Sequence, residues 1–274
     1  MFVKNPRVQL SWQLYYKLIH QNLSVPSYRV MLGIVLQHEF QEHWHDIYCD
    51  LPEQTESWAE LSEFRKIVGL SGRDWKKQCA SAVEELSGTG WFADIELVHG
   101  NRSIKWTLDR AIVEAQLDRD KYVLLSLEEI AACRTSLEHQ FVSELTRTRQ
   151  MKAPEFDCHA LKAVPKRGNN IDWKRFRPRL ERFFDKWGRD EGTSFVVGTA
   201  RSHLGDVTNV TIRTRTSHTN WFGWALYKFP PNSRVYLYEN GAMRQLGAEE
   251  IFRKVREKVP GFIPAKKRQL KRAA

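Results

Sequence analysis

The stretch from residue 171 to residue 187 places two kinds of side chain at helical spacing. Its large apolar residues recur at three- and four-residue steps and so share one side of a helix: Trp173, Phe176, Leu180, Phe183, Phe184 and Trp187. Lysines and arginines fall mostly on the other side. Cations of one sign neutralise phosphates, and an arginine can also donate two hydrogen bonds to guanine. The spacing therefore predicts a helix with an aromatic core face and a phosphate-binding face.

The candidate nucleic-acid contacts are lysines and arginines on two expected recognition helices and on the loops and hairpins beside them. In the first half of the chain they are Arg73, Lys76, Lys77, Arg102 and Lys105; in the second half they are Lys166, Arg167, Lys174, Arg175, Arg177, Arg179, Arg182 and Arg201. Phosphate contacts are expected to dominate affinity, with one or two arginines on each helix reading guanine. A solvated or salt-bridged surface residue is the alternative for each of them.

Pro178 lies inside the second of these helices. A proline lacks the backbone N–H and kinks a helix unless it lies in the first turn. The stretch therefore has two interpretations: a kinked helix, or a regular helix that begins near Arg177. In the second interpretation Lys174 and Arg175 lie on the loop that precedes the helix.

The elements around the first basic set are typical of a helix-turn-helix followed by a hairpin. Gly69 suits the position after a helix end, and Ser71 suits an N-cap. A hairpin directly after a recognition helix predicts a winged helix. The expected elements are helices at 7–22, 26–45, 58–68 and 73–87, a turn at 69–72, and strands at 91–98 and 103–108.

The second half of the chain repeats this order. Asp74-Trp75-Lys76 and Asp172-Trp173-Lys174 occupy the same place in their units, and at this spacing Ala82 aligns with Leu180 and Leu86 with Phe184. Ser126 and Glu129 are spaced as a capping box. The expected elements are helices at 125–130, 136–151, 156–164 and 171–187, and strands at 194–198 and 207–216.

These patterns predict a mainly α fold with small β-hairpin wings, an α+β protein of two tandem winged-helix domains. The expected division is an N-terminal winged-helix domain at 1–110, a connection at 111–120, a second winged-helix domain at 121–216, and an aromatic C-terminal extension with a basic tail at 217–274. A strand at 235–238 and a terminal helix at 248–259 are expected in the extension.

The chain's charge favours a polyanionic partner. It has 274 residues, a formal net charge of +10 and 42% hydrophobic residues, which suits a folded protein that binds nucleic acid. Its longest apolar run, 30–36, is far shorter than a membrane span of about 20 residues. The N-terminus lacks a signal-peptide pattern, and the four cysteines are widely spaced, so a cytoplasmic protein is expected.

Catalytic patterns are weak, and no cofactor, metal or catalytic residue is expected. The sequence contains no P-loop, dinucleotide fingerprint or nucleophile elbow. The cluster His38, His43 and His45 leaves a metal-dependent nuclease as an alternative. The local pattern is helical, however, and residues two apart on a helix point about 200° apart, which does not suit a shared ligand.

The segment 37–64 is acidic and contains only one sign of charge. No lysine or arginine occurs from Val30 to Phe64, whereas glutamates and aspartates recur through this stretch. Phosphates would repel such a surface. We therefore expect segment 37–64 to face a partner protein or the other domain.

Residues 60–70, read Glu-Leu-Ser-Glu-Phe-Arg-Lys-Ile-Val-Gly-Leu and followed by a long helix and a hairpin, resemble a winged-helix unit of the theta-type plasmid replication initiators. The resemblance covers residues 7–216 in architecture. It implies two tandem winged helices that bind repeated origin sites (iterons), as a monomer in initiation and as a homodimer in repression. The chain departs from the family in Pro178 and in its aromatic C-terminal extension.

The expectation is therefore sequence-specific binding of double-stranded DNA, at repeated sites, as a non-catalytic replication initiator of a plasmid or mobile element. A winged-helix transcriptional regulator is one alternative, and it differs in recognising a single palindrome rather than direct repeats. An RNA-binding or RNA-processing module of a CRISPR-type system is another, and preference for a hairpin RNA would distinguish it.

Overall fold

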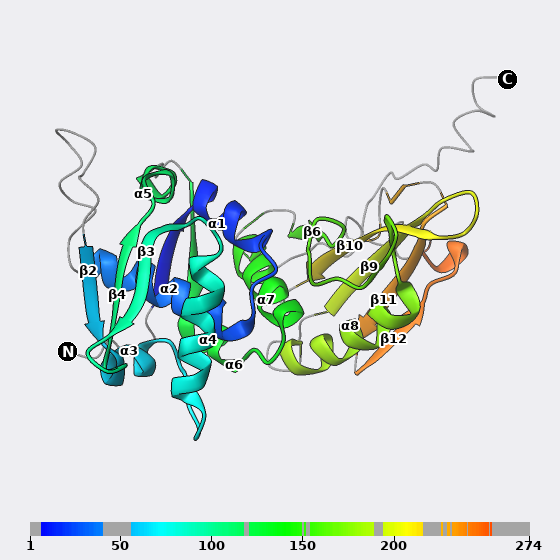
Figure 1. The fold of residues 1–274 in the computed structure, drawn as a ribbon. Coiled ribbons are helices and arrows are strands. Elements are labelled where there is room, and N and C mark those ends of the chain that lie inside the picture. Colours follow the sequence, from blue (N-terminus) through cyan, green and yellow to red (C-terminus); the bar gives the residue numbers. More distant parts are fainter. Residues whose placement is uncertain are drawn as a thin grey trace, which may run out of the picture. The chain divides into compact units, whose positions relative to one another are not determined.

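The computed structural model describes residues 7–40, 56–117, 121–149, 151, 154–188, 194–215, 226, 229–230, 232–239, 241–251 and 253 (Figure 1). The chain divides into two compact units. Unit 1 comprises Met1–Gln150 with Leu161–Ala163, and unit 2 comprises Met151–Ala160 with Val164–Ala274. Both contain helices and strands, which establishes a mixed α+β fold.

Unit 1 combines helices with two small antiparallel sheets. Its elements are β1 (Arg7–Ser11), α1 (Trp12–Ile19), α2 (Val25–Phe40), β2 (Glu56–Glu60), α3 (Leu61–Ile67), α4 (Trp75–Ser87), β3 (Phe92–Val98), β4 (Ser103–Leu108), α5 (Arg110–Leu117), β5 (Tyr122–Ser126), α6 (Leu127–Ala132) and α7 (Ser136–Thr148). Strands β2, β4 and β3 form one sheet in that order, and β1 pairs with β5 in the other.

Helix α2 lies at the centre of unit 1. Its side chains are buried on almost every side, including Tyr28, Met31 and Ile34, because α4, α6 and β1 all contact it. Gly33 permits the backbone of α2 to lie close to the Val68 side chain, because a Cβ at position 33 would lie 2.1 Å from Cγ1 of Val68. An all-round apolar helix is expected where elements surround it.

The first strand corrects the helix expected at 7–22. Residues 7–11 alternate polar and apolar, and Val8 and Leu10 are buried while Arg7 and Gln9 are exposed. This period of two suits β1, which pairs with β5 more than 100 residues later, and the helix begins only at Trp12.

The connection expected at 111–120 differs in the structure. Helix α5 occupies most of it and contacts α1 and β1. The Gln116 side chain accepts from the Ser11 backbone N–H at 2.9 Å and donates to the Gln9 carbonyl at 2.7 Å. Because β5 also pairs with β1, residues 121–149 belong to unit 1, and the units divide near residue 150.

The elements around the expected helix-turn-helix differ from the expectation in two places. Residues 56–60 form β2 rather than helix, and Trp58 is exposed there. Helix α4 begins at Trp75 with Asp74 at its N-cap, so Ser71 is not the cap. The turn between α3 and α4 uses Gly69, whose φ of 67° is costly for other residues. The N-cap at Ser126 is confirmed, because its hydroxyl accepts from the Glu129 N–H at 3.3 Å.

Unit 2 is built on a seven-stranded antiparallel sheet, much larger than the hairpin wing that was expected. Its strands and the helix that packs on them are β6 (Glu155–Asp157), β7 (Lys166–Arg167), β8 (Asn170–Ile171), α8 (Trp173–Trp187), β9 (Ser194–Arg201), β10 (Val207–Arg215), β11 (Arg234–Glu239) and β12 (Ala242–Gln245). The strand order is β12-β11-β9-β10-β8-β7, with β6 also paired to β10.

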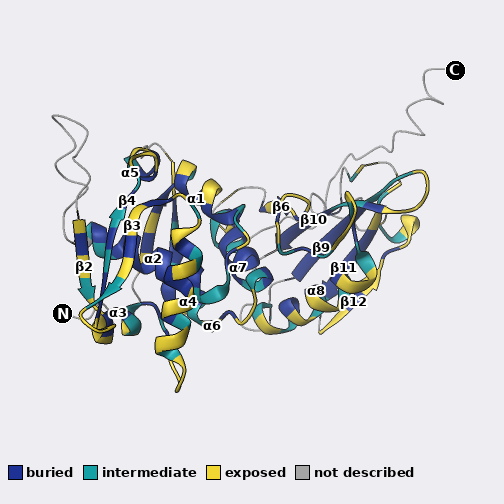
Figure 2. Ribbon diagram, viewed as in Figure 1, coloured by how far each residue is buried: buried dark blue, intermediate teal, exposed yellow. Residues whose placement is uncertain are grey.

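Strands β9 and β11 of unit 2 are buried on both faces (Figure 2). On one face α8 packs through aromatic residues, with Phe184 stacked on Phe195 at 4.1 Å and 5.2 Å from Tyr238. The opposite face holds the cluster Val196, Leu226, Val235, Leu237 and Leu246. Successive side chains along β9 and β11 point to opposite faces of the sheet, so each strand contributes apolar residues to both.

The segment expected to be a C-terminal extension therefore contributes to the core of unit 2. Strand β11 pairs with β9 over five residues, and β12 pairs with β11. The sheet would lose two strands and four of the five residues of this apolar cluster without residues 226–246. The strand expected at 235–238 is confirmed, and most of the terminal helix expected at 248–259 lies outside the described residues.

Candidate nucleic-acid interface

Helix α8 is regular from its first residue to its last, although it contains Pro178. The Asp172 carboxylate caps it by accepting from the Arg175 N–H at 3.2 Å. Phe176 and Leu180, on either side of Pro178, are fully buried and hold the backbone in place. Pro178 itself is exposed, so water can reach the Lys174 carbonyl that the missing N–H would have bonded. Lys174 and Arg175 thus lie in the first turn of the helix rather than on a loop.

The exposed face of α8 is a continuous cationic surface. At 100° per residue its exposed positions fall within an arc of about 140°. They are Lys174, Arg175, Pro178, Arg179, Arg182 and Lys186. Five of these six side chains are cations and none is acidic. Lys186 completes the face and was not among the candidate contacts drawn from the sequence.

The cations on this face have few intramolecular partners. Arg175 pairs with Asp172 at 3.6 Å, yet its side chain is 78% exposed. The Arg182 Nε donates to the Pro178 carbonyl at 3.2 Å, which leaves its other donors available. Within the described part of the chain, no ion pair involves Lys174 or Arg179. Such side chains can exchange solvent counterions for phosphates.

Arg177 behaves differently from its neighbours. It pairs with Glu181 at 3.0 Å, donates to the Met243 carbonyl at 3.3 Å, and lies over the Tyr236 ring at 5.6 Å. These contacts direct the side chain toward β11 and β12. Arg177 therefore positions α8 on the sheet, and its role as a DNA contact stays a prediction.

The sheet brings other candidate residues to the start of α8. Arg201 on β9 is paired with Val207 on β10, Val207 with Ile171 on β8, and Ile171 with Lys166 on β7. In this row of paired residues, Ile171 of β8 immediately precedes Asp172, the N-cap of α8. Lys166 and Arg167 are exposed in the β7–β8 hairpin, and the Lys166 Nζ donates to the His159 carbonyl at 2.7 Å. The pairing thus places Lys166 and Arg167 on the strand beside the one that leads into α8, and Arg201 two strands away on the other side.

Helix α4 of unit 1 carries a smaller basic set. Arg73, Lys76 and Lys77 are exposed at its start, whereas Cys79, Ala82, Val83 and Leu86 form its buried side. Trp75 is half-buried, and the Arg65 guanidinium covers its ring at 4.7 Å from the centroid. Trp173 and Trp187 of α8 are half-buried as well, although their spacing predicted core positions.

Arg102 and Lys105 lie three residues apart but in opposite surroundings. Arg102 is exposed after the β3–β4 turn, where His99, Gly100 and Asn101 all have positive φ. Lys105 lies on the middle strand of its sheet, within 3.3 Å of Glu56, 3.7 Å of Asp94 and 3.0 Å of Glu96. Hydrogen bonds to Glu96 and Glu56 raise the Lys105 pKa. Lys105 is therefore already neutralised by carboxylates.

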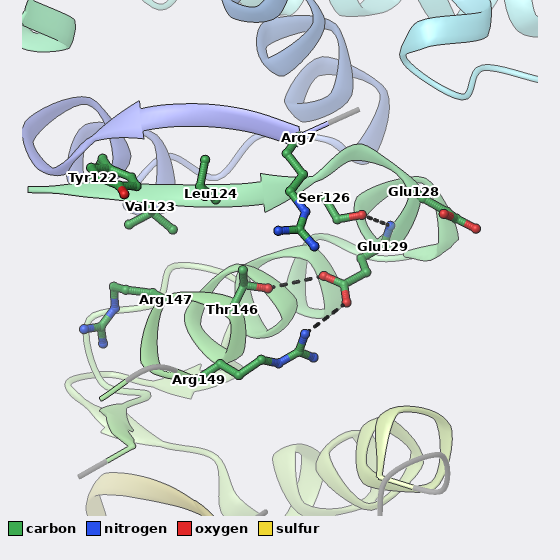
Figure 3. Close-up of a pocket in the computed structure, with 10 residues that line it drawn as sticks. All are labelled: Arg7, Tyr122, Val123, Leu124, Ser126, Glu128, Glu129, Thr146, Arg147 and Arg149. Carbon is green, nitrogen blue, oxygen red and sulfur yellow. Dashed lines mark hydrogen bonds and ion pairs between the residues drawn. The ribbon is translucent and has the colours of Figure 1, made fainter. Parts of the chain in front are cut away.

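A cavity of about 440 Å³ opens in unit 1 between the β1–β5 ladder and α7 (Figure 3). Arg7, Arg147 and Arg149 line it together with Glu128 and Glu129. The Glu129 carboxylate lies between Arg149, 3.6 Å away, and the Thr146 hydroxyl, 3.4 Å away. Because its positive and negative groups largely offset one another, this cavity lacks the single sign of charge found on α8.

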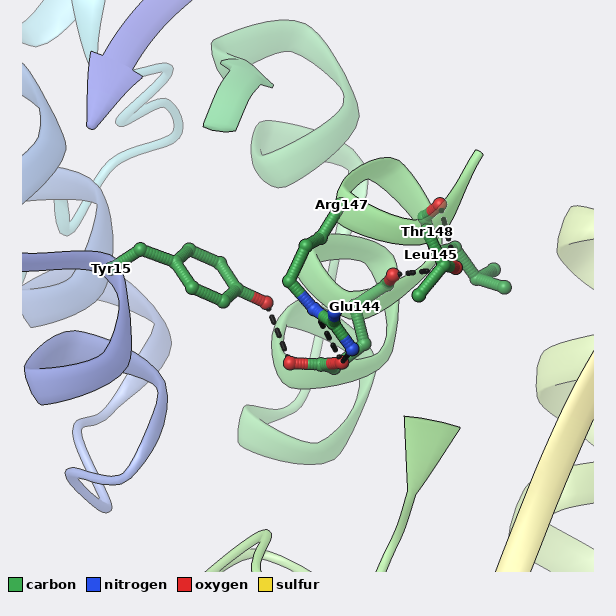
Figure 4. Close-up of polar contacts among 5 residues, drawn as sticks. All are labelled: Tyr15, Glu144, Leu145, Arg147 and Thr148. Carbon is green, nitrogen blue, oxygen red and sulfur yellow. Dashed lines mark hydrogen bonds and ion pairs between the residues drawn. The ribbon is translucent and has the colours of Figure 1, made fainter. Parts of the chain in front are cut away.

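Arg147 also belongs to a buried polar network beside this cavity (Figure 4). The Tyr15 hydroxyl donates to the Glu144 carboxylate at 2.8 Å, and the Arg147 Nε donates to the same carboxylate at 2.9 Å. Burial, reinforced by the Glu144 charge, raises the Tyr15 pKa well above its ordinary value. Tyr15 therefore remains a donor, and the network joins α1 to α7 as a structural contact.

The histidine cluster gives no metal site in the described residues. His38 is buried in α2, and His43 and His45 lie outside the described part of the chain. No group of three His, Cys, Asp or Glu side chains that could hold a metal ion occurs among the described residues. Burial raises the Cys79 pKa to about 11, so its thiol stays protonated. In the same part of the chain, no helix is long and apolar enough to cross a membrane.

Comparison with known proteins finds a solved structure with a similar fold but no protein with a similar sequence. No family model matches the chain, and no curated protein matches it. The crystal structure of a Pi initiator protein in complex with iteron DNA has a similar fold, with a TM-score of 0.57 and 11% sequence identity. The match covers 79% of this chain and 100% of that chain. At this identity the likeness is one of fold alone.

Proposed function

We propose that this protein binds double-stranded DNA at specific, repeated sites and initiates replication of a plasmid or similar mobile element, without catalysing a reaction. The observation that carries the proposal is the exposed face of α8. Five cations and no acidic side chain occupy the exposed positions of this one helix, and a B-DNA major groove of about 12 Å admits an α-helix. The fold likeness to an initiator bound to iteron DNA supports the same conclusion.

In this proposal each unit acts as a winged helix. The order α2, β2, α3, α4, β3, β4 in unit 1, with β2 and β3 on either side of β4, supports that assignment. In unit 2, α8 is followed by the β9–β10 hairpin. Each unit then offers one helix to a major groove and one hairpin to the backbone beside it.

The contacts are proposed to divide between affinity and specificity. Lys174, Arg175 and Arg182 would neutralise phosphates, and the unpaired Arg179 is the best candidate for a bidentate contact to guanine. In unit 1, Lys76 and Lys77 would hold the backbone at α4. The proposed protein partner on segment 37–64 would bind away from the DNA, because that segment is acidic.

The test is fluorescence anisotropy with duplexes from the DNA that flanks the gene, between about 50 and about 200 mM salt. We expect preference for a fragment with direct repeats and a logarithmic salt slope of about −4, from roughly five phosphate contacts. A single palindrome as the preferred site would instead identify a transcriptional regulator, and preference for a hairpin RNA would identify an RNA-binding module.

A charge-matched pair of variants locates the interface. Arg179→Ala should weaken binding by about ten- to a hundredfold, since a charge-assisted hydrogen bond contributes about 1.5 to 3 kcal/mol. Lys17→Ala removes one exposed cation from α1 and should leave affinity unchanged. Equal effects of the two variants, or no salt dependence in the wild type, would contradict the proposed function.

A further inference from the structure

The tip of the β9–β10 hairpin, residues 202–206, holds an aliphatic side chain in water. Leu204 is 78% exposed, more than any other large hydrophobic residue in the described part of the chain. Trp58 at 58% and Tyr122 at 56% come next, and each lies on a strand and carries a polar atom. Burial of a leucine side chain would stabilise the folded protein by about 2 kcal/mol, and an exposed leucine lacks this contribution.

Hydrogen bonds brace this tip in its outward conformation. The Ser202 N–H donates to the Asp206 carbonyl at 2.9 Å, and the Gly205 N–H donates to the Ser202 carbonyl at 3.0 Å. The Asp206 N–H donates to the Ser202 hydroxyl at 3.2 Å, and the Arg201 guanidinium donates to the Gly205 carbonyl at 2.7 Å. Gly205 has a φ of 89°. The turn is therefore rigid, and Leu204 stays exposed instead of folding back onto the sheet.

The tip lies beside the cationic face of α8. Val207, the first residue after the tip, pairs with Ile171, which immediately precedes the N-cap of α8. One strand spacing across the sheet and three residues along the hairpin place Leu204 roughly 11 Å from the start of α8. A B-DNA major groove is about 12 Å wide. A helix in that groove would therefore bring the tip over the adjacent backbone and minor groove.

The tip contributes little net charge to this position. Arg201 is opposed by Asp206 within five residues, and its guanidinium is engaged with the Gly205 carbonyl. Attraction to phosphates is therefore weak here, in contrast to α8. What the tip offers is an apolar side chain on a rigid support, and apolar side chains inserted from the minor groove unstack base steps in other protein–DNA complexes.

We propose that Leu204 is an apolar wedge that the β9–β10 tip inserts into the minor groove, next to the major groove occupied by α8. Unstacking is easiest at pyrimidine–purine steps such as TA and CA/TG. The protein's preferred duplex therefore has such a step beside the sequence read by α8, and the duplex is kinked there. This inference rests on the proposed DNA binding of α8.

The experiment compares Leu204→Ser, Leu204→Met and His203→Ala with the wild type on the duplex selected above. Fluorescence anisotropy gives the affinity and the salt slope. Energy transfer between labels at the two ends of the duplex measures its bending. Leu204→Ser should lower affinity roughly tenfold and reduce the bend, with the salt slope unchanged, because no charge is removed. Leu204→Met keeps the apolar volume and should bind within about twofold of wild type. His203→Ala, a neighbouring exposed position, should have no effect.

A DNA variant provides the second arm. Replacing the pyrimidine–purine step by GC should weaken wild-type binding and leave the Leu204→Ser protein unaffected. Unchanged affinity and bending in Leu204→Ser, with Arg179→Ala still defective, would overturn the wedge but preserve the DNA-binding function. Failure of the wild type to bind any duplex would overturn both. Thermal melting of each variant excludes unfolding, which is not expected at so exposed a position.

Discussion

Helices α4 and α8 present equivalent positions to solvent but very different residues. Each exposed position of α4 from Lys76 to Glu84 corresponds to an exposed position of α8 that lies 98 residues later. On α4 these are Lys76, Lys77, Ala80, Ser81 and Glu84; on α8 they are Lys174, Arg175, Pro178, Arg179 and Arg182. The buried pairs Ala82–Leu180 and Leu86–Phe184 keep the same spacing. The helices thus share a burial pattern, while their exposed faces differ.

This difference separates what packing requires from what binding requires. Packing fixes which side of each helix is apolar, and both helices satisfy it. Only α8 adds cations at the centre of its exposed face, where α4 has small or acidic side chains. We therefore expect α8 to provide most of the phosphate affinity. Small side chains such as Ala80 would allow the α4 backbone to approach base edges closely.

Exchanging the two faces should produce the largest effect. Arg179→Ser with Arg182→Glu gives α8 the residues of α4 and should weaken DNA binding roughly a thousandfold, since two charge-assisted contacts are lost at about 2 kcal/mol each. Ser81→Arg with Glu84→Arg gives α4 the residues of α8 and should strengthen binding roughly tenfold. Each exchange should change the logarithmic salt slope by about 2, in opposite directions, measured by anisotropy. Equal losses from both exchanges would show that the helices do not differ in their role.

Acid should destabilise unit 1 through His139, a residue with no buried counterpart among the described residues of unit 2. His139 stacks on Tyr28 at 4.0 Å, and its Nε2 lies 3.3 Å from the Leu23 carbonyl. Burial, together with the nearby Arg29, lowers its pKa from 6.5 to about 4. The unfolded chain therefore binds the proton more strongly than the folded chain. Stability is full above about pH 6.5 and falls by about 3 kcal/mol as the pH drops toward 4.

Urea unfolding at pH 7 and pH 4.5 measures this loss, with unit 1 followed separately from unit 2. His139→Gln removes the titrating group and should reduce the difference between the two pH values. Because carboxylates also titrate in this range, only the difference between wild type and His139→Gln is assigned to the histidine. Equal pH dependence in the two proteins would contradict the assignment.

The turn before α4 should be more sensitive to substitution than the hairpin before α8. Gly69 has a positive φ, and a Cβ there would lie 2.6 Å from the Ala131 Cβ. Gly72 and Gly168 also have positive φ but no atom within 4 Å of such a Cβ. Each of the three alanine variants should cost about 1 kcal/mol in backbone strain, and Gly69→Ala should cost about 2 kcal/mol more because it overlaps α6. Equal unfolding midpoints for the three variants would show that α6 can shift to accommodate the added Cβ at little cost in stability.

Local patterns predicted the faces of both helices and the β3–β4 hairpin, because these depend on neighbours in sequence. The spacing of Phe176, Leu180 and Phe184 determines which side of α8 packs, and strand 103–108 was predicted with its observed bounds. The two-strand ladder β1–β5 was missed, since Val8 pairs with Leu125 and the partner of a strand is not encoded beside it. The place of β11 in the sheet was missed for the same reason.

Rules for single residues failed where tertiary packing opposed them. Pro178 predicted a kink or a late start, but burial of Phe176 and Leu180 holds the helix regular, and solvent compensates the lost hydrogen bond. Lys105 looked like a wing contact because it is basic and follows a recognition helix. Its three carboxylate neighbours come from β2 and β3, and this arrangement appears only when the strands are paired.

The smallest expected effect is a contrast between Arg102 and Lys105 in the same hairpin. Arg102→Ala should weaken DNA binding a few-fold and reduce the salt slope by about 1, because an exposed cation can contact one phosphate. Lys105→Ala should leave affinity within about twofold of wild type. Its charge is already balanced by Glu56, Asp94 and Glu96, and phosphates would be repelled from that face.

Neutralising one partner of Lys105 sharpens this contrast without removing the lysine. Glu96→Gln weakens the closest partner of Lys105, at 3.0 Å, and makes this face of unit 1 less negative. If the sheet face points away from DNA, Glu96→Gln changes affinity as little as Lys105→Ala does. If the face touches DNA, Glu96→Gln strengthens binding and Lys105→Ala weakens it, and the hairpin then joins α8 as a phosphate-binding element. The pair thus decides whether unit 1 contacts DNA with its sheet or only with α4 and the hairpin tip.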